Sequence, residues 1–212
     1  MVGKITALKV QTKNQRRVNV FIDGNFAFGV HRNIASELQI GQELTEEAIN
    51  AILKKDEEEM AFQRALRYIQ FRERSETEVV RYLQKFNVSA DIITKVLDHL
   101  RYLELINDDK FAEHWAENRN AFRPRSRRVL TMELRKKGIS EEVIAQVMQS
   151  MPSEEELAYQ SAMKQARRYH DLPRQEFHHK LSNYLSRRGF SYEVISPVIA
   201  QVWENTQKQK EY

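Results

Sequence analysis

The densest group of chemically active side chains in the chain lies in residues 122–138, which read FRPRSRRVLTMELRKKG. This stretch contains one acid, Glu133, and seven basic residues: Arg123, Arg125, Arg127, Arg128, Arg135, Lys136 and Lys137. The resulting excess of positive charge can attract a polyanion or an acidic protein surface. Charge alone does not distinguish this role from that of an ordinary solvated surface with counter-charges nearby.

Further basic residues stand at related places in the sequence. Arg72 and Arg74 precede a predicted helix, as RPRSRR does, and Arg187–Arg188 end a later one, as Lys136–Lys137 do. Cations at a helix C-terminus complement the helix dipole by roughly 0.3–1 kcal/mol, which explains the two pairs without any function. RPRSRR lies at a helix start, where cations are unfavourable, so it is the stretch that most needs a functional explanation.

No residue pattern predicts catalysis. The Gly-containing runs IDGNFAFG and KKGIS lack the phosphate-binding patterns G-x-G-x-x-G and G-K-[ST]. The six histidines form no H-E-x-x-H, and the adjacent His178 and His179 point in different directions on a helix. Asp108 and Asp109 precede a predicted helix and are interpreted as capping residues. The sequence therefore predicts a binding protein that is not an enzyme and that holds no metal and no cofactor.

Composition limits the class of protein. The chain has no cysteine, which excludes disulfides, thiolate catalysis and cysteine zinc sites. Its 41% hydrophobic and 30% charged residues suit an elongated protein, and only 6 Gly and 4 Pro favour helices. No signal peptide is readable, and no segment approaches the roughly 18 apolar residues of a membrane helix. We expect a cytoplasmic monomer with no membrane partner.

The first 40 residues differ from the rest. ITALKV and RRVNVFI alternate apolar and polar residues, as half-buried strands do, and DGN at 23–25 predicts a turn before FAFGV. We expect two or three antiparallel strands. Because so small a sheet is marginal alone, it should pack on the helix that follows, which is expected to start near Thr45.

Beyond this segment every part of the sequence predicts helices, and one corner between two helices occurs three times with a period of 51. The copies are LQKFNVSADII, LRKKGISEEVI and LSRRGFSYEVI, which begin at Leu83, Leu134 and Leu185. Gly138 and Gly189 stand where a left-handed helix end is expected, and the first copy has Asn87 there. The second helices begin with acidic turns, so base reading by a helix-turn-helix is improbable. Contact through the basic helices before the corner is more plausible.

A helical period near 50 predicts a modular array. We expect a mainly α fold, an elongated curved array of three tandem three-helix repeats preceded by a small antiparallel β segment. The first repeat should hold three short helices. The expected segments are 1–50, with the β-hairpin and the start of a linking helix, and repeats at 51–106, 107–152 and 153–212.

Three stretches together carry a family resemblance. RERSETEVVRYLQKF, LINDDKFAEHWAENR and LRKKGISEEVIAQV resemble the RecX family of recombination regulators, over about residues 57–200. RVNVFIDGNFAFGV is similar to the N-terminus of the longer members. The departures are Asn87 in place of Gly and the absence, in RPRSRR, of a Gly that often follows that Arg.

The resemblance implies a non-enzymatic modulator of RecA in DNA repair and recombination. Family members bind the RecA–DNA filament in its helical groove and suppress filament growth, ATP hydrolysis and strand exchange. A repeated array could touch several protomers of such a partner. The residues expected to contact filament or DNA are Arg72, Arg74, Arg123, Arg125, Arg127 and Arg128, followed by Lys136, Lys137, Arg187 and Arg188.

Two other classes of function remain open from the residues. A stand-alone helical DNA-binding protein, acting on single- or double-stranded DNA through its basic face, should bind naked DNA tightly and lose affinity steeply with salt. A scaffold for an acidic protein unrelated to recombination should show neither property.

Overall fold

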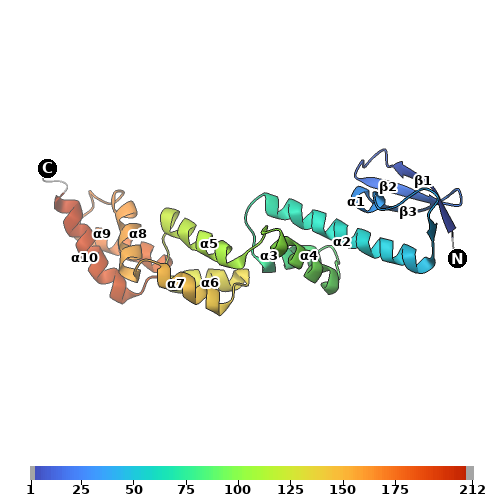
Figure 1. The fold of residues 1–212 in the computed structure, drawn as a ribbon. Helices are drawn as coiled ribbons and strands as arrows, with labels where there is room; N and C mark the ends of the chain where they lie inside the picture. Colours follow the sequence, from blue (N-terminus) through green and yellow to red (C-terminus); the bar gives the residue numbers. More distant parts are fainter. Residues whose placement is uncertain (1–2, 209–212) are drawn as a thin grey trace. The chain divides into compact units, whose positions relative to one another are not determined.

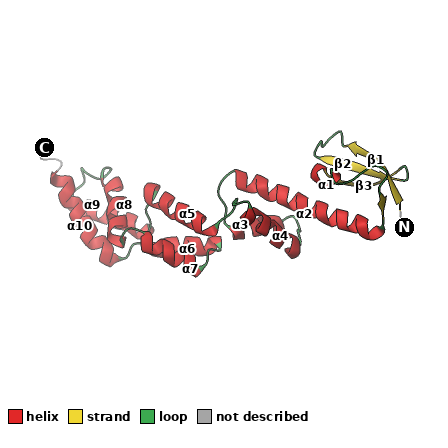
Figure 2. Cartoon of the chain, viewed as in Figure 1, coloured by secondary structure: helices red, strands yellow, loops and turns green. Residues whose placement is uncertain are grey.

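The computed structural model describes residues 3–208, in which ten helices and four strands form two compact units (Figures 1 and 2). The first unit takes in the chain up to residue 74 together with residues 79–106. The second takes in residues 75–78 together with the chain from residue 107 onward. The expected mainly helical fold with a small N-terminal sheet is confirmed. Within residues 3–208 no helix is both long and apolar enough to cross a membrane.

A four-stranded antiparallel sheet opens the first unit. The strands, in the spatial order β3-β2-β1-β4, are β1 (Gly3–Val10), β2 (Arg17–Ile22), β3 (Asn25–His31) and β4 (Glu43–Leu44). Asp23 and Gly24 form the predicted turn with φ of 48° and 83°, and positive φ at both positions suits the twist of a two-residue hairpin. The short strand β4 was not predicted, because two residues carry no alternation.

The sheet packs on the helix that follows it, as the sequence predicts. Helix α2 (Glu46–Gln70) begins after Thr45, whose Oγ1 accepts a hydrogen bond from the Ala48 N–H at 3.2 Å. The buried Asp56 carboxylate of α2 accepts from the His31 backbone N–H and pairs with Arg17 at 3.1 Å. These bonds attach β2 and β3 to α2. The short helix α1 (Arg32–Ala35) joins β3 to the loop that leads to β4.

The rest of the first unit is a three-helix cluster. The C-terminal half of α2 packs with α3 (Glu76–Gln84) and α4 (Ala90–Tyr102) around a core that includes Ala65, Leu83 and Leu100. The sequence predicts three short helices in the first repeat, and the prediction is wrong for the first of them. That helix is the C-terminal half of α2, which runs unbroken for 25 residues. The connecting residues KKDEEEM are polar, but they include good helix formers and neither Gly nor Pro, so nothing in them stops the helix.

The second unit contains six helices in the part that the structure describes. They are α5 (Asp108–Phe122), α6 (Arg127–Lys137), α7 (Glu141–Ser150), α8 (Glu154–Ala166), α9 (Arg174–Arg187) and α10 (Tyr192–Lys208). One continuous core runs through both helix triplets, from Phe111 to Val202. Side chains 51 residues apart share the same burial, and Leu134 and Leu185 are both fully buried. The repeat found in the sequence is therefore a repeat of packing.

The three copies of the corner have the predicted left-handed residue, with φ of 57° at Asn87, 81° at Gly138 and 91° at Gly189. A Cβ at Gly138 would overlap Thr77, and one at Gly189 would overlap Val129. Asn87 is exposed. Glycine therefore stands at the two corners against which the start of a helix is packed, and asparagine stands at the corner that is open to solvent.

We predict that Gly138→Ala destabilises the protein more than Gly24→Ala does. Both positions have positive φ, which costs a non-glycine residue roughly 1–2 kcal/mol, but an added Cβ meets nothing within 4 Å at Gly24. At Gly138 the overlap with Thr77 should add about 1–3 kcal/mol. Calorimetry, which detects melting of either unit, gives both free energies of unfolding. Equal losses in the two variants would show that close packing at Gly138 is not the reason for its glycine.

Candidate partner-binding surface

The RPRSRR stretch is held in place by a buried serine. Ser126 has no exposed surface, and its Oγ accepts a hydrogen bond from the Val129 N–H at 3.3 Å as the N-cap of α6. The first turn of α6 contains no acid and two cations, Arg127 and Arg128. The first turn of α6 therefore carries the positive charge that is unfavourable at a helix N-terminus, as the sequence predicts. Whether each arginine can bind a partner depends on the bonds that its side chain makes within the protein.

Arg125 is bound inside the second unit. Its guanidinium pairs with Glu133 at 2.8 Å, and the same carboxylate pairs with Arg119 at 2.8 Å. Glu133 also accepts from the Trp115 indole N–H at 3.0 Å. Within residues 3–208, the buried Nε of Arg125 has no hydrogen-bond partner. Arg125 thus ties the loop before α6 to α6 itself.

Arg127 is also engaged with the protein. Its Nη2 donates to the carbonyl oxygens of Met151 at 2.8 Å and Pro152 at 3.0 Å, just beyond the C-terminus of α7. Its backbone N–H donates to the Glu154 carboxylate at 3.0 Å. Carbonyl groups at a helix C-terminus carry partial negative charge, so the cation at the start of α6 is stabilised by the end of α7.

Arg123 and Arg128 remain available to a partner. Both side chains are exposed, and neither makes a hydrogen bond or an ion pair in the part of the chain that the structure describes. Arg128 shares one face of α6 with the exposed Met132 and Lys136, at helical spacings of four residues. Lys136 is exposed as well. These residues give α6 a basic outer face.

Arg135 and Lys137, at the end of α6, are bound to acidic residues. The Arg135 guanidinium binds Glu141 at 2.6 and 2.8 Å, and this hydrogen bonding raises the pKa of Arg135 and lowers the pKa of Glu141. Lys137 pairs with Glu78 at 2.6 Å and lies 4.7 Å from the centre of the Trp115 ring. Lys137 is therefore part of the internal packing of the second unit.

The basic end of α9 lies beside the RPRSRR stretch. The Arg188 carbonyl accepts from the Ser126 N–H at 3.1 Å, and the Arg188 guanidinium donates to the Pro124 carbonyl at 3.4 Å. Its neighbour Arg187 is exposed, and its side chain makes no bond among residues 3–208. The fold thus brings together two basic groups that the sequence showed only as separate stretches.

Arg72 and Arg74 lie in the first unit. Arg74 stacks on the Tyr68 ring at 4.0 Å and donates to the Tyr68 carbonyl at 3.4 Å. Arg72 is exposed, and its guanidinium donates to the Glu73 carbonyl at 2.7 Å. Of this pair, Arg72 is the more exposed, whereas Arg74 is held against α2.

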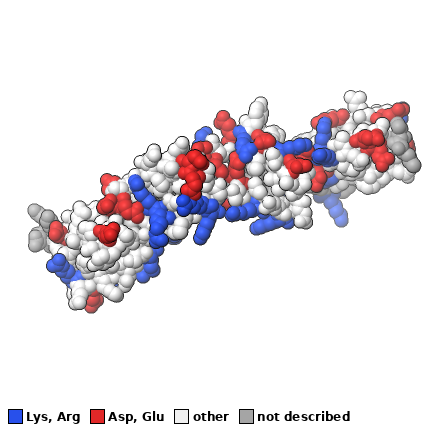
Figure 3. Space-filling model, turned by 90° about the horizontal axis from the view of Figure 1, so that it is seen from below, with Lys and Arg blue, Asp and Glu red and all other residues white. Residues whose placement is uncertain are grey.

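Sequence reasoning did not single out Lys164. This exposed residue of α8 donates from its Nζ to the Ala121 carbonyl at 2.5 Å, which adds a cation at the C-terminus of α5. No local pattern could have revealed it, because the two residues are 43 positions apart in the sequence. Figure 3 shows Lys and Arg side chains among the exposed residues of both units.

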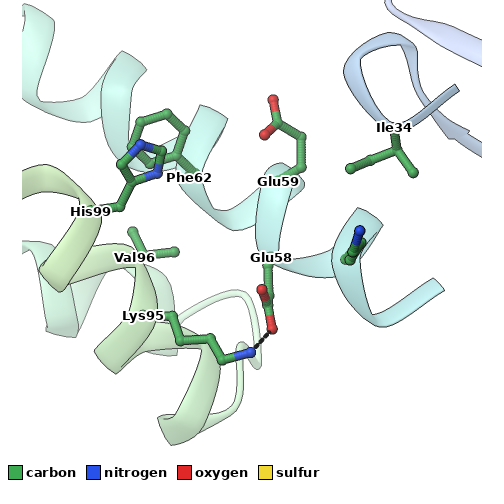
Figure 4. A pocket seen from close by; sticks show the side chains of 8 residues that line it. Ile34, Glu58, Glu59, Phe62, Lys95, Val96 and His99 are labelled. Carbon is green, nitrogen blue, oxygen red and sulfur yellow. Dashed lines mark hydrogen bonds and ion pairs between the residues drawn. The ribbon is translucent and has the colours of Figure 1, made fainter. Parts of the chain in front are cut away.

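Two cavities, one in each unit, are large enough to hold a small ligand. The first, of about 160 Å³, lies between α2 and α4 of the first unit, where Lys95 pairs with Glu58 and His99 stacks on Phe62 (Figure 4). Its charges compensate one another. The second, of about 650 Å³, lies in the second unit and is lined by Glu113 and Glu117 of α5. Among residues 3–208, no group of three potential metal ligands occurs.

Comparison with known proteins identifies the family. The family descriptions that match are "Regulatory protein RecX N-terminal domain" at residues 3–45 and the first, second and third three-helix domains of RecX at 61–100, 107–148 and 153–199. A Regulatory protein RecX of Bacillus pumilus is 30% identical over 98% of this chain and 80% of that relative. This chain belongs to the RecX family. A Bacillus subtilis RecX is 32% identical over 95% of this chain and 78% of its own length.

Solved RecX structures have the same fold. A crystal structure of regulatory protein RecX matches with a TM-score of 0.71 at 29% identity, covering 92% of this chain and 98% of that one. RecX from Lactobacillus salivarius matches with a TM-score of 0.59 at 25% identity, covering 70% of this chain and 97% of that one. The resemblance that the sequence suggested is confirmed, and the chain is a RecX-family regulatory protein with three helical domains.

We predict that Glu133→Gln destabilises this RecX-family protein by about 1–2 kcal/mol. The change leaves Arg119 and Arg125 without a counter-charge in a partly buried place, and an unsatisfied buried group costs about that much. Glu142→Gln, an exposed change on α7, should cost less than about 0.5 kcal/mol. Urea unfolding followed by tryptophan fluorescence measures both, since Trp115 and Trp203 lie in the second unit. A loss no larger for Glu133→Gln than for Glu142→Gln would contradict the central role of Glu133.

Proposed function

We propose that this protein regulates RecA by binding the RecA–DNA filament in its groove, without catalysing a reaction. Binding there would inhibit filament growth, ATP hydrolysis and strand exchange, and so regulate recombination and repair in the cytoplasm. Membership of a family of regulatory proteins supports a regulatory role. In this proposal the protein acts as a monomer through its three repeats and needs no cofactor.

One observation carries the proposal. Arg123, Arg128 and Arg187 come from two different repeats of the second unit and have no internal partner in the described chain. The bond between Ser126 and Arg188 brings the two repeats together. A ligand that offers negative charge at regular intervals can engage such a repeated surface with gain from multivalency. A nucleoprotein filament has this property.

The surroundings of the ten predicted residues give them two different roles in the proposal. The direct contacts are those whose side chains are exposed: Arg72, Arg123, Arg128, Lys136 and Arg187. The others hold this surface in place through internal bonds: Arg74, Arg125, Arg127, Lys137 and Arg188.

A second candidate function is a stand-alone DNA-binding protein. It is favoured by the guanidinium groups of Arg123, Arg128 and Arg187, which make no bond among residues 3–208, since phosphates attract exposed arginine without any protein partner. The two functions differ in what the protein recognises, which is the assembled filament in one case and the nucleic acid alone in the other.

Titration of the protein into RecA hydrolysing ATP on single-stranded DNA tests the proposal, with a parallel titration of the same DNA without RecA. Suppression well below the concentrations that bind naked DNA is the expected result. Suppression only after the bare DNA is saturated would mean competition for the strand and would favour the DNA-binding alternative. An unaffected ATPase would exclude the proposed inhibition.

We predict that the double variant Arg123→Gln, Arg128→Gln weakens binding to DNA-containing targets and reduces the slope of log K against log salt by about two, since two phosphate contacts would be lost. The charge-matched control is Arg101→Gln, Arg135→Gln, in which both arginines are already paired, with Asp98 at 2.7 Å and with Glu141 at 2.6 Å. The control should keep the original slope. An unchanged slope in the first variant would remove the phosphate contact and leave a contact with protein.

A further inference from the structure

An exposed phenylalanine stands at the same place in two of the three repeats. Phe71 is 84% exposed and Phe122 is 74% exposed, and the two are 51 residues apart. Each is followed by an exposed arginine, Arg72 or Arg123. In the third repeat the equivalent position is Pro173. Single exposed hydrophobic residues are ordinary in proteins. Exposure of the same aromatic side chain at two equivalent positions of the repeat suggests that it binds a partner.

Neither ring contributes to a core. Phe71 is the C-cap residue of α2, Phe122 is the last residue of α5, and both lie outside the hydrophobic clusters of their units. Four residues after each ring comes a fully buried serine, Ser75 or Ser126, which anchors the following helix start. Each ring is therefore presented to solvent from backbone that is fixed on both sides.

Two cations adjoin the backbone on either side of Phe122. Arg123 follows it with no internal partner in the described chain, and Lys164 places its Nζ 2.5 Å from the carbonyl oxygen of Ala121, the residue before the ring. Sinking Phe122 into an apolar pocket of a protein would force these charges to lose water at the rim of the contact. A flat base with its phosphates alongside satisfies both the ring and the cations.

We infer that Phe122, and its counterpart Phe71, stack on the bases of single-stranded nucleic acid while the neighbouring arginine and lysine bind its phosphates. Every base has a π-face, so such contacts tolerate any sequence, as a regulator that acts along a DNA strand requires. The inference rests on the proposed partner-binding surface and adds to it an aromatic contact with the bases.

The test uses the full chain and a fluorescent oligothymidylate, without RecA. Phe122→Ala and Phe122→Leu should each weaken binding about fivefold or more, whereas Phe122→Trp should retain it, because stacking needs an aromatic ring. The salt slope of Phe122→Ala should equal that of the original protein, since no phosphate contact is lost. The control is Tyr102→Ala, which removes an 83% exposed ring next to Arg101, an arginine already paired with Asp98. It should leave affinity unchanged.

Several results would overturn the inference. One is unchanged affinity for oligothymidylate in Phe122→Ala. Another is unchanged affinity in both Phe122→Leu and Phe122→Trp, which would indicate an apolar contact without stacking. Loss of RecA suppression in Phe122→Ala with normal oligothymidylate binding would make the ring an anchor for protein instead. Adding Phe71→Ala to Phe122→Ala should weaken binding further, and no further loss would remove the role of Phe71. Melting curves check that each variant is folded.

The failure of this inference can be told apart from failure of the proposed surface. If the Arg123→Gln, Arg128→Gln variant loses oligothymidylate binding and Phe122→Ala does not, the basic surface stands and stacking is refuted. If neither variant loses binding, stacking is refuted and the surface is not a DNA contact. The RecA ATPase titration remains an independent measurement of the regulatory proposal.

Discussion

The second unit depends on a hydrogen bond between a buried serine and the end of a helix that lies far along the chain. Ser75 donates from its Oγ to the Lys137 carbonyl at 2.6 Å, and Ser126 donates from its backbone N–H to the Arg188 carbonyl at 3.1 Å. A buried polar group without a partner is costly, so each serine requires its partner helix to end at that place. The glycines that end these two helices, Gly138 and Gly189, are explained by this close approach.

The same contact is reinforced by a second bond in both places. The residue after each serine donates its backbone N–H to an acid in the first turn of the next repeat, from Glu76 to Asp108 at 2.9 Å and from Arg127 to Glu154 at 3.0 Å. Close approach at the corner then requires glycine. The arginines nearest the buried contacts, Arg125, Arg127 and Arg188, are bonded within the second unit. The side chains of Arg123, Arg128 and Arg187 are exposed and make no bond among residues 3–208.

Much of this architecture is readable from the sequence because it is local. Strand alternation, the Asp23–Gly24 turn, the helix start at Thr45 and the left-handed corners each depend on a few neighbouring residues, and the structure has all of them. Because the sequence repeats with a period of 51, residues 51 positions apart are expected to pack alike, and Leu134 and Leu185 are both fully buried. The prediction of a separate short helix within α2 is wrong, since apolar spacing alone does not distinguish a polar stretch of good helix formers from a linker.

The partners of the basic residues could not be predicted, because they are set by contacts between distant parts of the chain. Arg127 looked anomalous at the start of a helix until the carbonyl groups beyond α7 supplied its partners. In the sequence, Glu133 is the single acid of a basic stretch. Its pairing with Arg119 and Arg125 depends on how α5 lies against α6. Sequence therefore showed where charge is concentrated, and the fold shows which of those charges are free.

The distance along the chain between each serine and its partner has a consequence for biosynthesis. Ser126 reaches its acceptor 62 residues later, at Arg188, so the RPRSRR stretch cannot take its final position while the ribosome is still making the third repeat. The bond that brings Arg187 and Arg188 beside this stretch can form only after residue 188 has been made. A chain that stops before the third repeat would carry Arg123 and Arg128 but would lack both Arg187 and the bond from Ser126 to Arg188.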